Sequence, residues 1–369
     1  MLLDQVTNSL LPAALSEQDQ QFERAFAVLN DGIRRRAFPG AAVAITARGA
    51  LVAWKALGRF TYSELSRKVE AGTVFDLASV TKALATTSAC MLLFEEGKLE
   101  LESPVASVLP EFRGDDPRRL AITFRMLLAH SSGLPAYVRL FETAKTRQEL
   151  LSQASKVPLI ADPGSTAEYS DVGFILLGEA LERITGQPLH LFCGNRIFTP
   201  LGLEHTGFNP ARWERSTIPP TENDRRFRHK LIRAAVNDEN AWVMGGVAGH
   251  AGCFGPAQEL AIFAECVLRG GSPLFDLHTV ELFTRREPSP AGTSRTLGWD
   301  TPSHPSQSGK YFSPRAYGHL GYTGTSLWID PERQLSVTLL TNRTWPDRSS
   351  QIIRQIRPAF HDAVVEALR

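Results

Sequence analysis

The fold is decided by two β-rich runs near the start of the chain, Ala41-Ala42-Val43-Ala44-Ile45-Thr46-Ala47 and Leu51-Val52-Ala53-Trp54-Lys55-Ala56-Leu57. The link between them, Arg48-Gly49-Ala50, is short and contains glycine, and such a link between β-rich runs predicts a hairpin. Ahead of the hairpin, apolar residues recur at helical spacing from Ser16 to Ile33. The chain is therefore predicted to open with a helix followed by two antiparallel strands.

A matching pair of β-rich runs lies at the far end of the chain, at residues 325–329 and 335–341, on either side of a turn at 330–333. A helical pattern follows from about residue 349 to 368. Both ends are expected to contribute to one antiparallel sheet, with the N- and C-terminal helices packed on it.

Between these ends the patterns are mainly helical and are broken by loops that contain proline and glycine. The better helix candidates are Phe124–Leu128, Arg147–Ser155, Val172–Thr185, Leu189–Ile197 and Ala257–Leu268. The predicted fold class is α+β: an antiparallel sheet flanked by terminal helices, with an inserted helical region. We expect a lead-in at 1–16 and one domain at 17–369, its sheet part about 17–78 and 286–369 and its helical part about 79–285. A ligand cleft is expected where the two parts meet.

Composition limits the classes of partner. The chain has 369 residues, of which 43% are hydrophobic and 21% charged, and its formal net charge is +1. Without a basic block there is no electrostatic case for nucleic acid or an anionic membrane, so a small-molecule substrate is expected. The four cysteines lack the spacing of metal ligands, and no metal site is predicted. Cys90 and Cys266 fall on helical patterns, where a thiol behaves as a small buried hydrophobe.

Targeting signals are weak. The first fifteen residues contain no basic residue and no uninterrupted apolar run, so they make a poor signal peptide. No later stretch approaches 18 uninterrupted apolar residues, so no transmembrane helix is expected. The sequence predicts a cytoplasmic protein, or a periplasmic or secreted one if a leader has been removed. The oligomeric state stays open.

The segment Phe75-Asp76-Leu77-Ala78-Ser79-Val80-Thr81-Lys82 carries the first candidate site. An extended stretch gives way here to a helical pattern that runs from Ser79 to Glu96 and stops at Gly97. Residues three apart share a helix face, so the Lys82 amine can reach the Ser79 oxygen. Backbone N–H groups at the helix start also favour developing negative charge. Ser79 is therefore a candidate activated nucleophile, although Ser-x-x-Lys alone is common.

The second candidate is Tyr169-Ser170-Asp171, in a loop before a predicted helix, and two interpretations stay open. In one, the Tyr169 phenol relays the serine proton and Asp171 binds Lys82 or a substrate donor. In the other, Asp171 caps the helix and Tyr169 packs as an amphipathic aromatic side chain.

The third candidate is the glycine-rich stretch from Tyr317 to Ser326, which leads into a predicted strand. Small residues at a strand start let the backbone approach a ligand closely. A backbone N–H here could join that of Ser79 in facing an oxyanion. The alternative is an ordinary β-turn with a surface histidine at His319.

Together these stretches resemble the penicillin-recognising serine hydrolases, which include class C β-lactamases, DD-peptidases and related esterases. Ser79-Val80-Thr81-Lys82 resembles the family's Ser-x-x-Lys motif, Tyr169-Ser170-Asp171 its Tyr-x-Asn motif, and His319-Leu320-Gly321 its Lys-Thr-Gly or His-Thr-Gly motif. The order and separations also fit, and the resemblance extends from about residue 20 to the C-terminus.

The resemblance implies a covalent mechanism without a cofactor. Ser79 would attack a carbonyl with Lys82 and Tyr169 together as general base, and the backbone N–H groups of Ser79 and Tyr322 would hold the oxyanion. Asp171, His319, Gly321 and Tyr322 would contact substrate. Peptidase, β-lactamase, amidase and esterase remain open, because all use these catalytic parts.

Two departures from the family motifs affect what the resemblance implies. Asp171 replaces the usual asparagine, and a carboxylate accepts hydrogen bonds but donates none. An ionised Asp171 should favour a charged Lys82 and shift the base role toward Tyr169. His319-Leu320-Gly321 lacks the lysine and threonine that grip a substrate carboxylate in the family, so β-lactams are expected to be poor substrates.

Further stretches of the chain also resemble segments that are common in this family. Those around His130 and His250 are interpreted as mainly structural, because their glycines and proline demand particular backbone conformations. The polar runs 221–224 and 237–240 resemble a branch that includes muramyl-peptide amidases. They could line the rim of the substrate site, and solvated loops are their default interpretation.

Two other classes are weighed against this one. An α/β-hydrolase is disfavoured because the chain has no Gly-x-Ser-x-Gly and its patterns do not alternate strand and helix. A non-turnover penicillin-binding or sensing module on the same scaffold stays open.

Overall fold

The computed structural model describes residues 15–210 and 214–369. The expected lead-in at 1–16 lies almost wholly outside the described residues, and the domain boundaries stay predictions. Within the described ranges, no helix combines the length and apolar character needed to cross a membrane.

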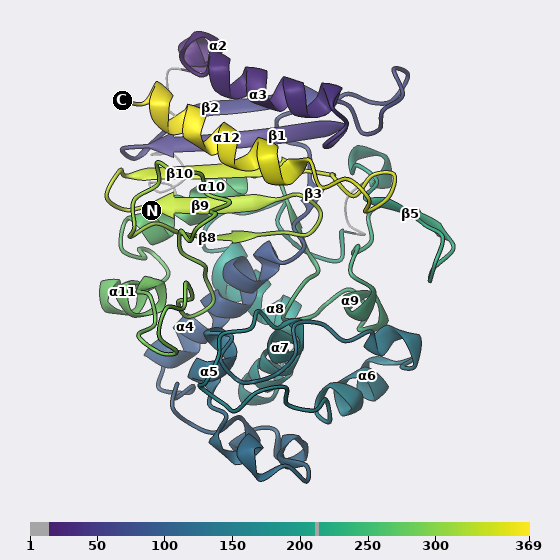
Figure 1. Ribbon diagram of the computed structural model, residues 1–369, viewed down its shortest axis with the longest axis vertical. Helices are drawn as coiled ribbons and strands as arrows, with labels where there is room; N and C mark the ends of the chain where they lie inside the picture. Colours follow the sequence, from purple (N-terminus) through teal and green to yellow (C-terminus); the bar gives the residue numbers. More distant parts are fainter. Residues whose placement is uncertain (1–14, 211–213) are drawn as a thin grey trace.

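A five-stranded antiparallel sheet forms the centre of the upper layer, with strand order β2-β1-β10-β9-β8 (Figure 1). Its strands are β1 (Gly40–Ala47), β2 (Ala50–Gly58), β8 (Tyr317–Leu320), β9 (Ser326–Asp330) and β10 (Leu335–Thr341). The two ends of the chain meet inside this sheet, where Val43 of β1 pairs with Leu339 of β10. The predicted α+β class with one sheet built from both ends is confirmed.

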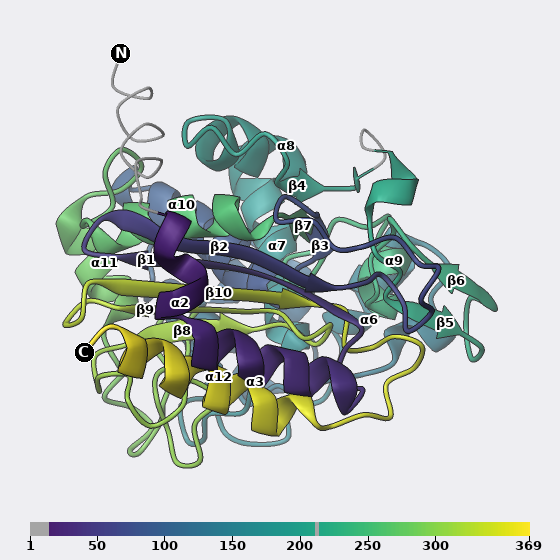
Figure 2. The same cartoon turned by 90° about the horizontal axis from the view of Figure 1, so that it is seen from above.

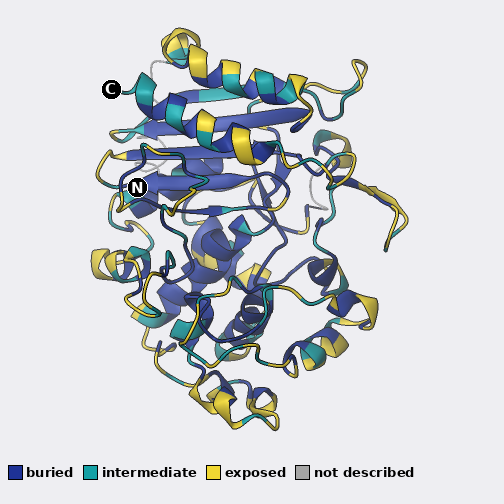
Figure 3. Ribbon diagram, viewed as in Figure 1, coloured by how far each residue is buried: buried dark blue, intermediate teal, exposed yellow. Residues whose placement is uncertain are grey.

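Helices cover both faces of the sheet. Figure 2 shows α3 (Glu23–Arg34) and α12 (Ile353–Ala367) side by side on one face, with α10 (Ala257–Leu268) on the opposite face. In β1, Val43 packs in the cluster under α3 and α12, whereas Ala44 packs in the cluster that includes α10. Because alternate side chains point to opposite faces, a strand covered on both sides is apolar throughout. Figure 3 shows this as buried strands beneath helices with exposed outer faces.

The rest of the chain is mainly helical and packs below the sheet (Figure 1). Its helices are α4 (Ser88–Glu95), α5 (Phe124–Leu128), α6 (Arg147–Ala154), α7 (Asp171–Thr185), α8 (Leu189–Cys193), α9 (Glu239–Val243) and α11 (Leu277–Thr284). A further short helix, α2 (Gln18–Gln21), precedes α3 near the N-terminus. Two π-helical segments lie at Lys82–Thr87 and Gly194–Phe198. Short 3-10 turns lie at Leu15–Glu17, Val105–Ser107, Pro110–Arg113, Pro117–Ala121, Leu140–Glu142 and Arg215–Thr217.

Two small sheets lie outside the five-stranded sheet. One has the order β3-β7-β4 and consists of β3 (Phe75–Asp76), β7 (Cys253–Gly255) and β4 (Gly207–Phe208). The other is a hairpin of β5 (Glu222–Asp224) and β6 (Lys230–Ile232). The first small sheet fixes the entry into the segment that carries Ser79, because β3 pairs with β7 through Phe75 and Asp76.

Most predicted elements are present, and the differences have physical causes. The predicted hairpin is β1–β2, and α5 and α10 have the predicted bounds. The C-terminal helix begins at Ile353 rather than near residue 349. The small sheets and β8 were not predicted, because strands of two to four residues are too short to show a period. Cys90 and Cys266 are buried free thiols, as expected.

Candidate active site

The turn that presents Ser79 is held by a buried carboxylate. Asp76 Oδ1 accepts the N–H of Ala78 at 2.8 Å, and Asp76 Oδ2 accepts the N–H of Asn237 at 2.6 Å. Ala78 has a φ of 46°, a conformation that costs a non-glycine residue about 1–3 kcal/mol. Burial raises the pKa of Asp76 to about 6 against the effect of these N–H groups. The strained turn leaves Ser79 partly exposed at the start of a helix.

Lys82 is fully buried one turn after Ser79 and makes three hydrogen bonds. Its Nζ donates to Ser79 Oγ at 3.0 Å, to Asp171 Oδ1 at 2.6 Å and to the His250 carbonyl at 3.0 Å. An ammonium has three donors, so this geometry satisfies all of them. The segment is π-helical from Lys82 onward, a local widening that is frequent at functional sites.

Tyr169 lies in the loop before α7, and Asp171 is the first residue of that helix. The helix cap is Ser170, whose Oγ accepts the N–H of Gly173 at 3.1 Å. Asp171 is the first helical residue and its side chain reaches Lys82, so the interpretation of Asp171 as a mere cap is wrong. The Tyr169 ring lies beside Lys82, whose Nζ is 4.8 Å from the ring centroid. Burial raises the pKa of the Tyr169 hydroxyl, and Lys82 and Ser79 act against that effect. The structure thus brings the four residues of the first two motifs together.

The charge states of this cluster follow from burial and neighbours. Burial opposes the Lys82 ammonium, but the Asp171 carboxylate and the hydrogen bonds of the site outweigh it and raise the pKa of Lys82. Burial also raises the pKa of Tyr169, against the lowering effect of Lys82. In the resting state, therefore, the lysine is protonated and the tyrosine is neutral.

The third stretch faces Tyr169 from the sheet. His319 lies on β8 and is only 3% exposed, so the alternative of a surface histidine is wrong. Its ring centroid lies 6.0 Å from that of Tyr169. Its Nδ1 lies 2.8 Å from the Leu320 carbonyl, which can only accept, so Nδ1 carries the hydrogen and Nε2 is bare. Burial lowers the pKa of His319 to about 3, and Lys82 adds to this effect.

Gly321 follows β8 where two backbones approach closely. A Cβ at this position would lie 1.9 Å from Thr325 Oγ1 and 2.5 Å from the Leu77 carbonyl. Thr325 Oγ1 in turn donates to that carbonyl at 2.9 Å. The absence of a side chain at Gly321 therefore lets the loop that holds Tyr322 lie against the turn that holds Ser79.

Two backbone donors are candidates for holding an oxyanion. Within residues 15–210 and 214–369, neither the N–H of Ser79 nor that of Tyr322 donates to a protein acceptor. Arg343 fixes the Tyr322 peptide, because its Nε donates to the Tyr322 carbonyl at 2.7 Å and its guanidinium lies 4.4 Å from the ring centroid. The Tyr322 side chain itself is 49% exposed.

His130 and His250 contact residues of the site and hold them in position. His130 Nδ1 accepts the N–H of Ser170 at 3.0 Å, and its ring packs 4.6 Å from that of Tyr169. Burial holds the pKa of His130 well below its ordinary value. His250 supplies a carbonyl to Lys82, and its Nε2 lies 2.8 Å from Asp238 Oδ1. Both contacts agree with the structural interpretation of these histidines.

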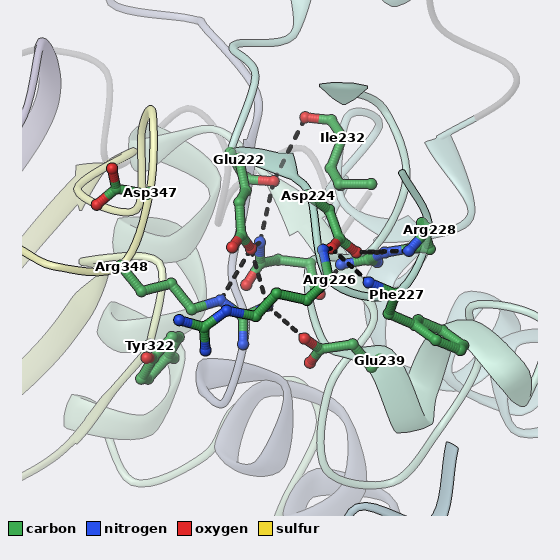
Figure 4. Close-up of polar contacts among 12 residues, drawn as sticks. Glu222, Asp224, Arg226, Phe227, Arg228, Ile232, Glu239, Tyr322, Asp347 and Arg348 are labelled. Carbon is green, nitrogen blue, oxygen red and sulfur yellow. Dashed lines mark hydrogen bonds and ion pairs between the residues drawn. The ribbon is translucent and has the colours of Figure 1, made fainter. Parts of the chain in front are cut away.

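The two polar runs were interpreted as solvated loops, and that interpretation is wrong. Glu222 and Glu239 are nearly buried, and Asn240 is fully buried. Figure 4 shows Arg348 between Glu222 and Glu239, with the Tyr322 ring beside it. The ion-pair distances are 2.8 Å to Glu222 and 2.7 Å to Glu239. The sequence hides this network because Arg348 lies more than 100 positions away from both acids.

Arg295 is a residue at the site that no sequence motif indicated. Its guanidinium lies 5.4 Å from the centroid of the Tyr169 ring, and its positive charge helps lower the pKa of His130 and of His319, after burial. Arg295 belongs to a long connection before β8 without regular pattern, so only the folded structure places it beside Tyr169.

Metal chemistry has no candidate ligand set in the part of the chain that the structure describes. No group of three or more histidine, cysteine, aspartate or glutamate side chains gathers there in a way that could hold a metal ion. The residues that do lie together are a serine, a lysine and a tyrosine, which are residue types that take part in covalent catalysis.

The fold and this cluster define a class of serine hydrolase that acts on amides or esters. Residues 20–358 match the family model named Beta-lactamase, and the chain belongs to this family. The expected resemblance to β-lactamases and penicillin-binding proteins is thereby confirmed.

Two curated relatives are similar to most of this chain. The chain is 34% identical to the "N-acetylmuramyl-L-alanine amidase" of Bacillus subtilis, over 89% of this chain and 81% of the relative. It is also 34% identical to the "Putative D-alanyl-D-alanine carboxypeptidase" of Escherichia coli K12, over 79% of this chain and 74% of the relative.

Solved structures agree on the fold. The hydrolase EstCE1, described as having promiscuous acyltransferase activity, has a TM-score of 0.75 at 24% identity and covers 93% of this chain and 99% of its own. An octameric penicillin-binding protein homologue from Pyrococcus abyssi has a TM-score of 0.72 at 20% identity, with coverage of 94% and 76%. At such identities these likenesses describe the fold alone.

Proposed function

We propose that this protein hydrolyses a small amide of the cell-wall peptide type through an acyl intermediate on Ser79. The observation that carries the proposal is the partly buried hydrogen bond of 3.0 Å that Lys82 Nζ donates to Ser79 Oγ, with the Tyr169 ring 4.8 Å from the same Nζ. A serine held in this way has a base within reach of its proton, which is the requirement for nucleophilic catalysis.

Acylation would proceed as follows. Ser79 Oγ bonds to the substrate carbonyl carbon while its proton passes to the Tyr169–Lys82 pair. The carbonyl oxygen gains negative charge, which the backbone N–H groups of Ser79 and Tyr322 stabilise. The carbon–nitrogen bond then breaks, and the pair returns the proton to the leaving amine. Water repeats the sequence on the ester and releases the carboxylic acid.

The Tyr169–Lys82 pair must lose one proton before it can act as the base. Because Asp171 stabilises the Lys82 ammonium, the phenolate of Tyr169 beside that ammonium is the reactive form of the pair. The raised pKa values of both groups make this form scarce near neutral pH. Activity is therefore expected to increase toward alkaline pH.

The substrate class rests on two supports. The relatives from Bacillus subtilis and Escherichia coli carry the names of enzymes that act on cell-wall peptides. Asp171, moreover, is partly accessible and can only accept hydrogen bonds, which favours a substrate that presents an amide N–H. A carboxylesterase is the second candidate, because an ester would use the same serine, base and oxyanion donors.

The first test uses intact-protein mass spectrometry after incubation with benzylpenicillin, on the wild type and Ser79→Ala in parallel. A Ser79-dependent adduct shows slow deacylation and supports a peptidase-like or sensing role. Free penicilloate without an adduct indicates a β-lactamase. If neither an adduct nor penicilloate forms, the assignment moves to an amidase or an esterase.

Hydrolysis of p-nitrophenyl acetate then tests the nucleophile itself. Ser79→Ala is expected to abolish the enzymatic rate while its thermal unfolding curve stays that of the wild type, because Ser79 is partly exposed. Comparable turnover by a folded Ser79→Ala would contradict the proposal. Parallel assays with N-acetylmuramyl-L-alanine and with a simple ester distinguish amidase from esterase.

A further inference from the structure

A buried arginine of α12 contacts the backbone of the loop at 321–325. Arg357 is 4% exposed, and its Nη2 donates to the Thr325 carbonyl at 3.4 Å. The same carbonyl accepts the N–H of Gly321 at 2.8 Å. Arg357 Nη1 donates to Gln307 Oε1 at 3.1 Å, and its Nε has no partner among the described residues. The Arg357 guanidinium is thus held by two neutral acceptors, and one of its N–H groups is unused.

Arg343 contacts the same loop and is also nearly buried. Its backbone N–H donates to the Thr323 carbonyl at 2.8 Å, and its Nε donates to the Tyr322 carbonyl at 2.7 Å. Its Nη1 donates to the Ser350 carbonyl at 3.3 Å, in the connection that leads into α12. Because α12 begins at Ile353, Arg343 links the loop that holds Tyr322 to the start of this helix.

Arg354 joins Arg343 and Arg357 in an arginine cluster. It lies in the first turn of α12, and residues three apart on a helix share a face, so Arg354 and Arg357 are neighbours. The Gln307 side chain bridges them, because its Nε2 donates to the Arg354 carbonyl at 3.2 Å while its Oε1 accepts from Arg357. Burial lowers the pKa of Arg357 to about 9, and the charges of Arg343 and Arg354 add to this effect. The Arg354 side chain is exposed, so solvent reaches the cluster there.

The arginine cluster has no acidic partner in the part of the chain that the structure describes. None of its three guanidinium groups forms an ion pair there. Arg348, by contrast, is paired with two glutamates. Burial lowers the pKa of Arg343, and the nearby charge of Arg354 acts in the same direction. Buried like charges without a counter-charge are costly, so the cluster favours an anion from solution.

The start of α12 adds to this positive charge. The helix has 15 residues, and its first turn, which the structure describes in full, contains no acidic residue. Its N-cap, Ile352, makes no side-chain cap hydrogen bond. The positive end of a helix dipole favours an anion, which a chain often supplies as an acidic side chain in the first turn. Here the first turn carries Arg354 instead, so the same end of the helix attracts an anion twice over.

We propose that the arginine cluster binds inorganic phosphate at the start of α12 and that the bound ion stabilises the loop that holds Tyr322. The planar fork of a guanidinium matches a phosphate with two parallel hydrogen bonds. Because Arg343 and Arg357 are nearly buried, the ligand is a small ion. Its charge offsets the repulsion between the arginines, which then hold the Tyr322 and Thr325 carbonyls more firmly. This site goes beyond the proposed hydrolase function and does not depend on it.

Isothermal titration calorimetry with inorganic phosphate, at constant ionic strength in chloride buffer, measures the binding. Arg354→Gln is expected to weaken the affinity about 10- to 100-fold, the effect of one or two charge-assisted hydrogen bonds. Arg354 is exposed, so this variant should fold as the wild type, which circular dichroism melting checks. Arg354→Lys keeps the charge but loses the fork and should bind with intermediate affinity. Arg113→Gln, at an exposed arginine of the 3-10 turn Pro110–Arg113, is the matched control and should keep the wild-type affinity.

Hydrogen–deuterium exchange measures the effect on the loop. In the wild type, saturating phosphate should slow the exchange of a peptide that covers residues 319–326 about 3- to 10-fold, because the bound ion stabilises the closed loop against local opening. The same concentration of phosphate should leave this peptide unchanged in Arg354→Gln. Phosphate also stabilises proteins in general by exclusion from their surface, and the comparison of the two proteins removes that contribution.

Several outcomes would contradict the proposal. No binding of phosphate, or equal affinity in the wild type and Arg354→Gln, would overturn the site. If that equal affinity is accompanied by competition with p-nitrophenyl acetate, the ion binds at Ser79 instead. Binding that depends on Arg354 without slower exchange at 319–326 would overturn the link to the loop. Failure of Ser79-dependent ester hydrolysis is a separate result, because neither measurement requires turnover.

Discussion

Lys82 and Asp171 form a buried ion pair in which Nζ lies 2.6 Å from Oδ1, and this pair sets the charge state of the candidate base. The Lys82 side chain has no exposed surface, and that of Asp171 is 16% exposed. A buried amine without a partner would have a lowered pKa, whereas the carboxylate reverses the direction. The motif that this stretch resembles has an asparagine here, and an asparagine could not form this ion pair.

Asp171→Asn is expected to shift the pH profile of ester hydrolysis toward lower pH. The substitution removes the charge that raises the pKa of Lys82, and burial then favours the free amine. More of the Tyr169–Lys82 pair is consequently deprotonated at neutral pH. The measurement is kcat/KM for p-nitrophenyl acetate from pH 6 to 10. An alkaline limb that stays in place, or moves upward, would exclude control by Asp171.

Tyr169→Phe is expected to reduce kcat about 10²- to 10⁴-fold, the usual weight of a general base, with a much smaller change in KM. The ring and its packing on His130 are retained, so only the hydroxyl is removed. Tyr62→Phe, a tyrosine of the β2–β3 connection, is the matched control and should behave as the wild type. An active Tyr169→Phe enzyme would assign the base role to Lys82 alone.

Gly321→Ala is expected to impair catalysis by separating the two oxyanion donors. The new methyl group would meet Thr325 Oγ1 and the Leu77 carbonyl well inside van der Waals contact, so the loop of Tyr322 must move away from Ser79. We expect a loss of kcat of about 10²-fold, as for removal of one oxyanion donor. Gly72→Ala, where an added Cβ meets nothing within 4 Å, is the control. Full activity of folded Gly321→Ala would refute the close approach.

Asp76 gives a prediction for stability. Its pKa of about 6 lies above the 3.8 of an unfolded aspartate, so between these values the folded state holds more of the proton. The stabilisation is fully present below pH 3.8 and is lost as the pH rises through 6. As the pH falls from 7 to 4, the free energy of unfolding of the wild type should increase by up to about 3 kcal/mol relative to that of Asp76→Asn, whose amide does not titrate.

Urea unfolding of both proteins at several pH values between 7 and 4 measures this difference. A free-energy difference between wild type and Asp76→Asn that is constant with pH would show that Asp76 has an ordinary pKa in the folded protein.

The sequence by itself determined the sheet, the family and the proposed nucleophile. Continuous apolar runs at 41–47 and 335–341 specify strands covered on both faces, because each face needs alternate side chains to be apolar. Ser79 and Lys82 lie three residues apart, so local helical geometry alone brings them together. Such features depend on a few residues that are neighbours in the sequence, so they can be predicted from the sequence alone.

Only the tertiary structure decided what surrounds that nucleophile. The capping role went to Ser170, which released Asp171 to pair with Lys82 across 89 positions. His319 became buried, and Arg295 came to lie over Tyr169. These outcomes depend on how separate segments pack, and the burial and neighbouring charges that set each pKa exist only after packing. Local sequence therefore specified the reactive residues, and the fold specified their charge and the groups that face a substrate.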